Sequence, residues 1–378
     1  MAKSKRSLTV FMLAMINVAA ICSIKNWALT AEYGFSSLFY YFLGVALFLI
    51  PCSLVAAELA SAWPEKGGIF VWVKKALGHK LAFLAVWLLW AENLFYYPTL
   101  LSFLAASLAY IFKPALAGNA IYTFCIILSA FWAATLINLR GIKTSGWISS
   151  LGVIAGTIIP GLLIIVSGIV WFAQGRPLEI DFSWGTLIPK LSSGNDLALL
   201  AGMLLGFAGM EMSAVHARDV VNPQKNYPKA IMLSALIIII LSVLGTLAIG
   251  IMIPKGEINI ISSAIETIKI FLVQYHVGWL TPVMAFLIAF GAFGTLNTWT
   301  VGPVRGLLAA ADNGELPPIF HRVNKHNMPS FMMILQAIVV SIVSLLFLFS
   351  KSVNESFWIL IVIAAQLYII MYALMFIS

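Results

Sequence analysis

Charge is scarce in this chain. Only 10% of its 378 residues are Asp, Glu, Lys or Arg, whereas 62% are hydrophobic and the mean hydropathy is +1.01. A soluble domain carries about a quarter of charged residues, so this composition excludes an ordinary water-soluble protein. Apolar runs of about 20 residues, the length that crosses a bilayer as a helix, recur from end to end. Because no long polar linker or low-complexity tract interrupts them, we expect a single membrane domain over residues 1–378.

Cysteine and histidine are also few. Cys22, Cys52 and Cys125 lie in apolar segments without metal-ligand spacing, and the five histidines are scattered. We therefore expect no metal site, no disulfide framework and no cofactor. The spans lack an H-E-x-x-H pattern, paired Asp residues and a Ser/His dyad, which argues against an intramembrane enzyme. A channel would more often show repeated pore motifs, whereas the polar groups here gather at two points.

Ten spans are expected, and the basic residues orient them. With the N-terminus in the cytoplasm, many more Lys and Arg residues face inwards than outwards, as the positive-inside rule requires. The net charge of +8 therefore reflects this topology rather than nucleic-acid binding. We expect a multi-pass protein of the cell inner membrane with a cytoplasmic N-terminus. The expected spans are roughly 8–31, 38–62, 81–112, 120–139, 147–172, 196–216, 230–253, 277–311, 331–350 and 356–377.

The sixth expected span is interrupted. It begins as an apolar helix and then meets Gly206 and Gly209, with the carboxylate of Glu211 just beyond. A helix in lipid can open only where it is buried in protein or lines a cavity. An ionisable residue at that depth indicates a functional site, and broken helices form the substrate sites of secondary transporters. The alternative is a close contact between two helices through small residues.

The first expected span is irregular too, because Asn17, Ser23, Lys25 and Asn26 interrupt its apolar run. Two interrupted spans that lie five spans apart indicate an inverted repeat of five plus five helices. We expect the repeats at about 8–172 and 196–378, with discontinuous helices 1 and 6 facing each other near the middle of the membrane.

Motifs stand in three loops on the predicted cytoplasmic side. The second span leads into AEL and WPEKGGIFVWV, the sixth into RDVVNP and NYPKA, and the eighth into GPVRG and DNGELPPIF. In their order they resemble the motifs of the amino acid–polyamine–organocation transporter superfamily, across residues 8–330, with Asn313 inserted before Gly314 in the last motif. The chain is most similar to the bacterial glutamate/γ-aminobutyrate antiporter family.

The resemblance implies a leucine-transporter-like all-α helical bundle that works by alternating access. It implies a secondary active transporter that exchanges amino acids or takes them up with protons, and a polyamine or organic-cation carrier of the same fold is the alternative. Family members usually have twelve spans, so we expect helices 11 and 12 to be absent. The eighth span carries Thr295 and Asn297 where some relatives carry a carboxylate, so the substrate is not fixed as glutamate. The expected partners are an amino acid and the bilayer, with a monomer or homodimer as the assembly.

The two breaks supply what an amino acid zwitterion needs. Its carboxylate requires N–H donors, which the N-terminal end of a half-helix offers, and its ammonium requires acceptors such as unwound carbonyls. The resemblance assigns the two breaks these same roles. Phe207 is either an aromatic lid over the substrate or a packing residue. The candidate substrate-binding residues are Ala20, Ile21, Cys22, Ser23, Ile24, Glu92, Leu205, Gly206, Phe207, Ala208, Gly209 and Thr295.

The buried ionisable groups Glu92, Glu211 and Lys25 are the candidates for proton coupling, because a low dielectric favours the neutral form of a group such as a carboxyl. Glu92 contacts the substrate amine, carries the coupling proton or pairs with Lys25. Glu211 either holds the broken helix open through hydrogen bonds or contacts the substrate directly. Glu58 is expected to contact Arg218 or Arg305 and so to organise a cytoplasmic loop. The candidate gating residues are Glu58, Gly67, Gly68, Arg218, Asp219 and Arg305.

Overall fold

Most of the chain forms membrane-length helices. The computed structural model describes residues 9–63, 68–141, 151–152, 154–189, 200, 203–211, 220–254, 257–259 and 261–378. Within these ranges, eight helices are long and apolar enough to cross a membrane, which confirms a multi-pass membrane protein. They match eight of the ten expected spans to within a few residues at the described ends. The eight are Gly34–Ala62, His79–Phe112, Ala120–Leu139, Ile154–Ala173, Gln224–Met252, Gly278–Asp312, Ser330–Phe349 and Val353–Ile377.

The first expected span is two short helices, α1 (Val10–Ile21) and α2 (Ile24–Ala31). Thr9 begins α1 by accepting a hydrogen bond from the backbone N–H of Met12, which satisfies one of the free donors at a helix start. Cys22 and Ser23 then adopt extended conformations, and the helix resumes at Ile24. The break predicted in this span is therefore present.

The break in the sixth expected span lies within residues 203–211, and the rest of that span falls mostly outside the described ranges. Residues 203–205 are helical, the chain turns at Gly206 and Phe207, and Gly209 has a φ of +119°. This backbone conformation strains any residue with a Cβ atom. A Cβ at Gly209 would also lie 3.1 Å from the ring of Trp299 and 3.3 Å from Ile21. Glycine therefore allows both the turn and the approach of its neighbours.

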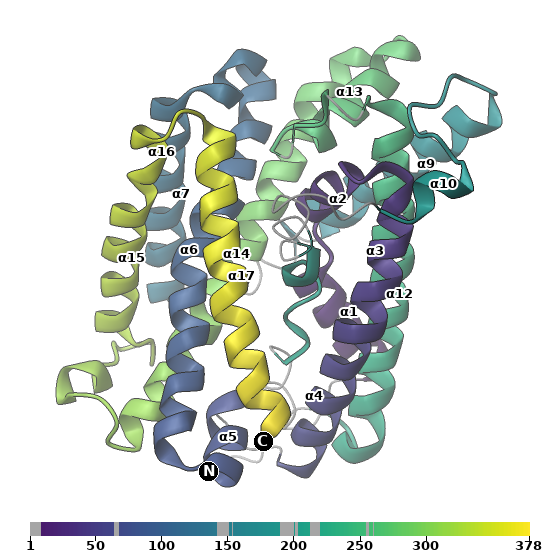
Figure 1. The fold of residues 1–378 in the computed structure, drawn as a ribbon. Helices are drawn as coiled ribbons and strands as arrows, with labels where there is room; N and C mark the ends of the chain where they lie inside the picture. The colour runs from purple at the N-terminus through teal and green to yellow at the C-terminus, as the bar shows by residue number, and fades with distance from the viewer. Residues whose placement is uncertain are drawn as a thin grey trace.

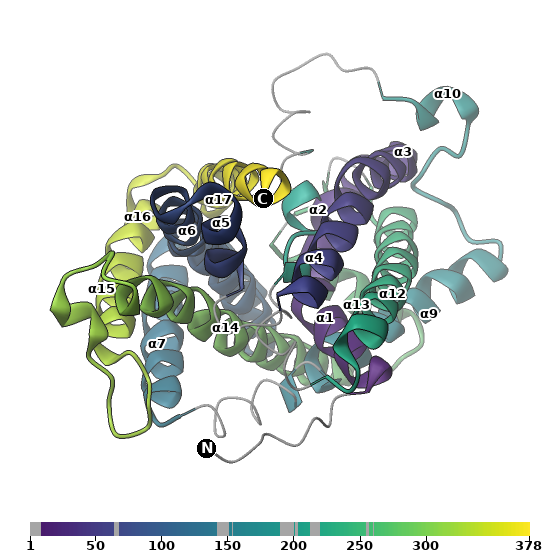
Figure 2. The same cartoon turned by 90° about the horizontal axis from the view of Figure 1, so that it is seen from below.

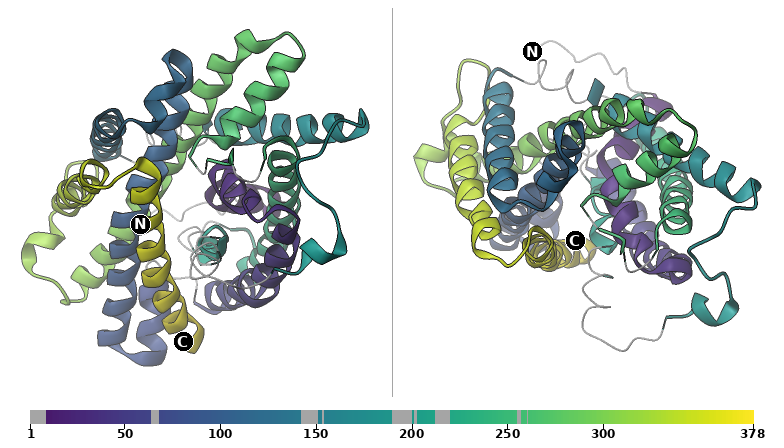
Figure 3. Two further views of the ribbon diagram at one scale, coloured as in Figure 1. Left: turned by 45° about the horizontal axis from the view of Figure 1, so that its top comes forward. Right: turned by 90° about the horizontal axis from the view of Figure 1, so that it is seen from above.

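The long helices form two groups that stand side by side in all the views (Figures 1, 2 and 3). In one group, α6 packs against α7, α14, α15 and α17; in the other, α12 packs against α1, α2, α4 and α9. The two breaks face α6, α14 and α17 of the first group, where buried polar side chains can meet. The bounds are α4 (Ile50–Ala62), α6 (His79–Phe112), α7 (Ala120–Leu139), α9 (Ile159–Ala173), α12 (Pro223–Met252), α14 (Thr281–Asp312), α15 (Ser330–Ser344) and α17 (Val353–Ile377).

The connecting elements gather at two opposite ends. The short helix α5 (Ile69–Leu77) and the C-terminal end of α17 lie at the bottom of Figure 1, whereas α13 (Ser263–Gln274) and α16 (Leu346–Phe349) lie at the top. This distribution agrees with spans that alternate in direction. Between the two ends, large apolar side chains point outwards, including Phe42 at 73% exposure. Such a surface suits lipid rather than water.

The fifth and eighth spans touch through their backbones. The fifth span opens with a π-helical turn, η4 (Ile154–Ile158), which packs against α14. A Cβ at Gly156 would lie 2.1 Å from the carbonyl oxygen of Leu287, and one at Gly291 would lie 2.5 Å from the carbonyl carbon of Gly156. Two glycines therefore allow a contact that any larger residue would prevent.

Candidate functional site

A narrow cavity lies where the two helix breaks meet. It draws its walls from both halves of the first span, from the sixth-span break, and from α6, α14 and α17. It has room for about one water molecule, so a bound amino acid would require its side chains to move apart. The lining residues are Ile21, Asn26, Glu92, Tyr96, Leu205, Gly206, Ala208, Trp299 and Tyr368.

Glu92 is the buried carboxylate of this cavity. It lies near the middle of α6 with 1% of its surface exposed. Its Oε2 accepts a hydrogen bond of 2.7 Å from Nδ2 of Asn93, which also donates to the carbonyl of Leu89. A carboxylate held in this way can receive a substrate ammonium or a proton.

Lys25 does not form the ion pair that was one of the alternatives for Glu92. Its Nζ instead donates to Oγ1 of Thr99 at 3.3 Å and lies 4.5 Å from the ring centre of Tyr96 and 5.4 Å from that of Phe357. Hydroxyl and aromatic partners hold the ammonium because α2 directs it between α6 and α17. In the described part of the chain, Glu92 and Lys25 are near enough to interact through space but are not in contact.

Glu211 holds the sixth-span break against the last helix. Its carboxylate accepts hydrogen bonds of 2.5 Å from both Tyr368 and Tyr372. The Tyr372 hydroxyl also accepts a hydrogen bond of 2.9 Å from the backbone N–H of Gly209. These four groups thus satisfy one another inside the membrane, as buried polar groups must. This geometry favours the structural role expected for Glu211.

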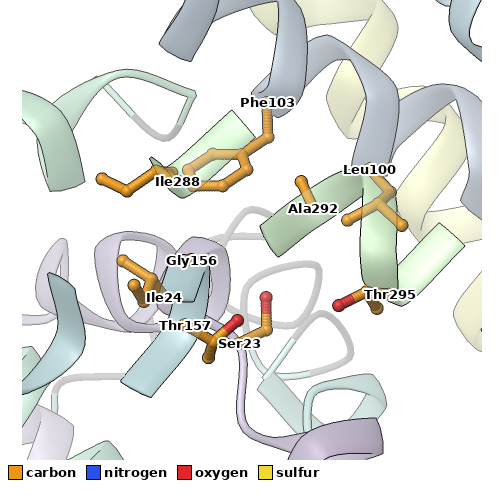
Figure 4. Close-up of a pocket in the computed structure, with 9 residues that line it drawn as sticks. All are labelled: Ser23, Ile24, Leu100, Phe103, Gly156, Thr157, Ile288, Ala292 and Thr295. Carbon is orange, nitrogen blue, oxygen red and sulfur yellow. The ribbon is translucent and has the colours of Figure 1, made fainter. Parts of the chain in front are cut away.

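Thr295 belongs to a second, adjoining pocket rather than to the cavity with Glu92. Figure 4 shows the hydroxyls of Ser23, Thr157 and Thr295 close to one another, with apolar side chains opposite them. Ile24 also lines this pocket. The expected substrate-binding residues of the first span are therefore divided, because Ile21 lines the cavity and Ser23 lines the second pocket.

Phe207 packs between helices. Its ring centre lies 5.7 Å from that of Tyr41, and its edge approaches Gly44 of α3 (Ser37–Gly44). It does not line the cavity, which favours its packing role over the role of a lid. Cys22 faces another apolar pocket beside Trp27, and Ala20 lies in the last turn of α1.

A wide vestibule leads from Glu211 towards the end of the molecule that holds α5. It has a volume of about 440 Å³, and Gly68, Arg305 and Asp312 line it. Of the two partners expected for Glu58, Arg305 is not in contact with it, and Glu58 has no ion-pair partner among the described residues. Instead, Lys74 of α5 donates to Oδ1 of Asn313 at 2.5 Å. Gly67, Arg218 and Asp219 lie outside the described ranges.

Sequence reasoning missed four lining residues: Asn26, Tyr96, Trp299 and Tyr368. Asn26 could have been found from the sequence, since it is an amide within an apolar span. The three aromatic residues could not, because an aromatic side chain in an apolar helix is normally part of the core.

These features define a class: a multi-pass membrane protein whose two broken helices enclose a small polar cavity between helix groups. The sequence profile of the amino acid permease family matches residues 6–378. The chain belongs to this family of transporters, and it is an amino acid transporter of the membrane.

Individual relatives extend this relationship over almost the whole chain. An uncharacterized transporter of Legionella pneumophila is 42% identical over 99% of this chain and 80% of its own length. A glutamate/gamma-aminobutyrate antiporter of Lactococcus lactis is 28% identical over 99% of this chain and 76% of its own length. A probable agmatine/putrescine antiporter of the same species is 24% identical over 86% of this chain and 68% of its own length. These relatives confirm the expected resemblance.

Proposed function

We propose that the chain exchanges amino acids across the cell inner membrane by alternating access, with the cavity around Glu92 as the substrate site. The observation that supports this most is that two helix breaks and a buried carboxylate line one cavity. Backbone N–H groups at the start of α2 would bind the substrate carboxylate. Unwound carbonyls near Leu205 and Ala208, together with Glu92, would bind the ammonium.

The aromatic walls give the cavity its conformational freedom. The rings of Tyr96 and Trp299 have centres 6.0 Å apart, and both side chains line the cavity. Because the cavity holds about one water molecule, substrate binding moves these rings apart. The vestibule at Glu211 would be the exit on the side of α5, which the basic residues assign to the cytoplasm.

The architecture that fits this mechanism has ten spans in one domain, as two inverted repeats of five around discontinuous helices 1 and 6. The eight membrane-length helices and the two breaks support it. The N-terminus would be cytoplasmic, and the carrier would be a monomer or a homodimer. Polyamine exchange is the alternative, which the agmatine/putrescine antiporter among the relatives favours.

Counterflow in proteoliposomes tests the proposal. Vesicles loaded with one unlabelled compound at a time from a panel of amino acids and diamines receive a trace of the same labelled compound outside. Exchange predicts saturable uptake that internal substrate accelerates. Uptake that does not saturate and does not depend on internal substrate would contradict a carrier, and acceleration by diamines alone would favour the polyamine alternative.

A further inference from the structure

Lys25 is a cation enclosed by the protein within the membrane. Only 1% of its surface is exposed, and its partners are the Thr99 hydroxyl and the rings of Tyr96 and Phe357. Thr99 is itself engaged, since it donates to the carbonyl of Tyr96 at 2.8 Å. Within the described ranges, Lys25 is in contact with no carboxylate.

This set of partners does not neutralise the ammonium. Aromatic rings and a hydroxyl attract a cation, but each contributes less than an anion at contact distance. Removing a charge from water is costly unless a counter-charge compensates for it. Glu92 acts on Lys25 only through space and not in contact. A lysine kept at this depth therefore indicates a functional group that an anion joins at contact distance for part of the transport cycle.

The position of Lys25 identifies that partner. Tyr96 lines the cavity, and the Lys25 ammonium lies against its ring. Asn26, which follows Lys25 in the sequence, lines the cavity as well. The Tyr96 side chain thus contacts the ammonium and also lines the substrate site. Because the cavity is too small for an amino acid, a movement of Tyr96 that enlarges it would also uncover Lys25.

The two buried charges divide the recognition of the substrate between them. Glu92 is available for the ammonium, and the backbone at the start of α2 is available for the α-carboxylate. Lys25 is then available to bind a second anionic group of the substrate. A diamine would place a cation against Lys25, which like-charge repulsion disfavours.

We infer that Lys25 is the specificity-determining residue of this carrier: it pairs with a side-chain carboxylate of the substrate and selects acidic amino acids over their amides and over diamines. This inference rests on the proposed exchange of amino acids at the Glu92 cavity. It assigns the selectivity to one residue without requiring Glu92 to carry a proton.

Inhibition of counterflow by L-glutamate, L-glutamine and putrescine tests the inference in the wild-type protein. Glutamate and glutamine have nearly the same shape and differ by one charge. We expect glutamate to compete about 10- to 100-fold more strongly than glutamine, the range of one charged hydrogen bond, and putrescine to compete least. Equal competition by glutamate and glutamine would overturn the inference, whatever the variants do.

Variants then assign the preference to Lys25. Lys25→Met should bring the glutamate-to-glutamine ratio close to one and strengthen competition by putrescine, whereas Lys25→Arg should keep the wild-type order. Lys269→Met, on an exposed face of α13, should change nothing. A folded Lys25→Met protein that keeps the wild-type ratio would overturn the inference and show a structural lysine. If Lys25→Met fails to fold, Lys25→Gln is tested in its place. The glutamate-to-glutamine ratio of the wild-type protein then still shows whether the carrier prefers a side-chain carboxylate.

The same experiment separates the two levels of the argument. A wild-type protein that exchanges no amino acid contradicts the proposed function itself. One that exchanges amino acids without regard to the side-chain carboxylate contradicts only the role of Lys25.

Discussion

Single hydroxyl groups have large effects in this molecule because they satisfy buried backbone and carboxylate groups. The Tyr372 hydroxyl is bonded to both Glu211 and the N–H of Gly209. In lipid, neither of those groups has water as a substitute partner. The break in the sixth span therefore depends on a residue that is 163 positions away in the sequence.

Tyr372→Phe should destabilise the protein by about 1–3 kcal/mol, because it leaves a buried donor and part of a carboxylate unsatisfied. Thermal unfolding of the purified protein in detergent measures the loss. Tyr275→Phe is the matched control, since the Tyr275 side chain is exposed and its hydroxyl makes no hydrogen bond in the described ranges. Equal unfolding temperatures for the two variants would show that the hydroxyl of Tyr372 is dispensable.

Glu92→Gln distinguishes the remaining roles of that residue. The amide keeps the size of the side chain and the hydrogen bond to Asn93, but it removes the negative charge and the exchangeable proton. If Glu92 carries the coupling proton, uptake driven by a pH gradient should be lost while exchange at fixed pH continues. If Glu92 binds the substrate amine, both should weaken, with affinity falling by about 1.5–3 kcal/mol.

Glu257→Gln, in an exposed loop position, serves as the control for this change. Wild-type uptake and exchange in Glu92→Gln would leave the carboxylate without either role, and the cavity would then have to recognise amines through carbonyl groups alone.

At the scale of elements, glycine sets how closely helices approach. The π-helical turn η4 meets α14 where Gly156 faces Leu287 and Gly291. Trp27 of α2 fills a similar notch in α12, where a Cβ at Gly245 would lie 2.2 Å from its ring. Small residues at helix contacts are the usual means of close packing in membranes.

Gly156→Ala should therefore be strongly destabilising, by about 1–3 kcal/mol or more, because the new methyl group meets backbone atoms that cannot turn aside. Gly118→Ala is the matched control, since nothing lies within 4 Å of a Cβ at that position. Thermal unfolding of the two variants should differ by several degrees. Similar stability would mean that η4 and α14 can separate at little cost.

At the scale of the whole molecule, the sidedness of the ends is testable. Single cysteines at Lys351 and Lys113 should react with an impermeant reagent added outside intact cells, whereas one at Lys74 should react only in broken membranes. The structure places α5, which contains Lys74, at the end opposite α16 and its neighbour Lys351. Labelling at position 74 in intact cells would reverse the proposed orientation.

Most of the fold follows from the sequence because lipid restricts what a chain can do. Apolar length determines a span, and a glycine or amide inside a span marks a break, so residues near Ser23 and Gly209 could be identified. Thr295 lines a different pocket from Glu92, because the position of a residue along a helix does not fix which neighbours it meets. It stands one turn, about 6 Å, from Trp299 on α14, which is enough to place it in a different pocket.

The contacts of α17 were not predictable. Tyr368 and Tyr372 lie in a uniformly apolar run, and their role depends on meeting Glu211 from a distant part of the chain. The absent contact of Glu58 has the same origin, since a charge near a loop has many possible partners and only the tertiary structure selects one.

The bond between Gly209 and Tyr372 also sets an order of events during synthesis. At about 5–20 residues per second, the ribosome adds the 163 residues between them in roughly 8–30 seconds. Until α17 has been made, Glu211 lacks both tyrosines. The nascent carrier therefore contains an incomplete site, and the arrival of α17 is the step that completes it.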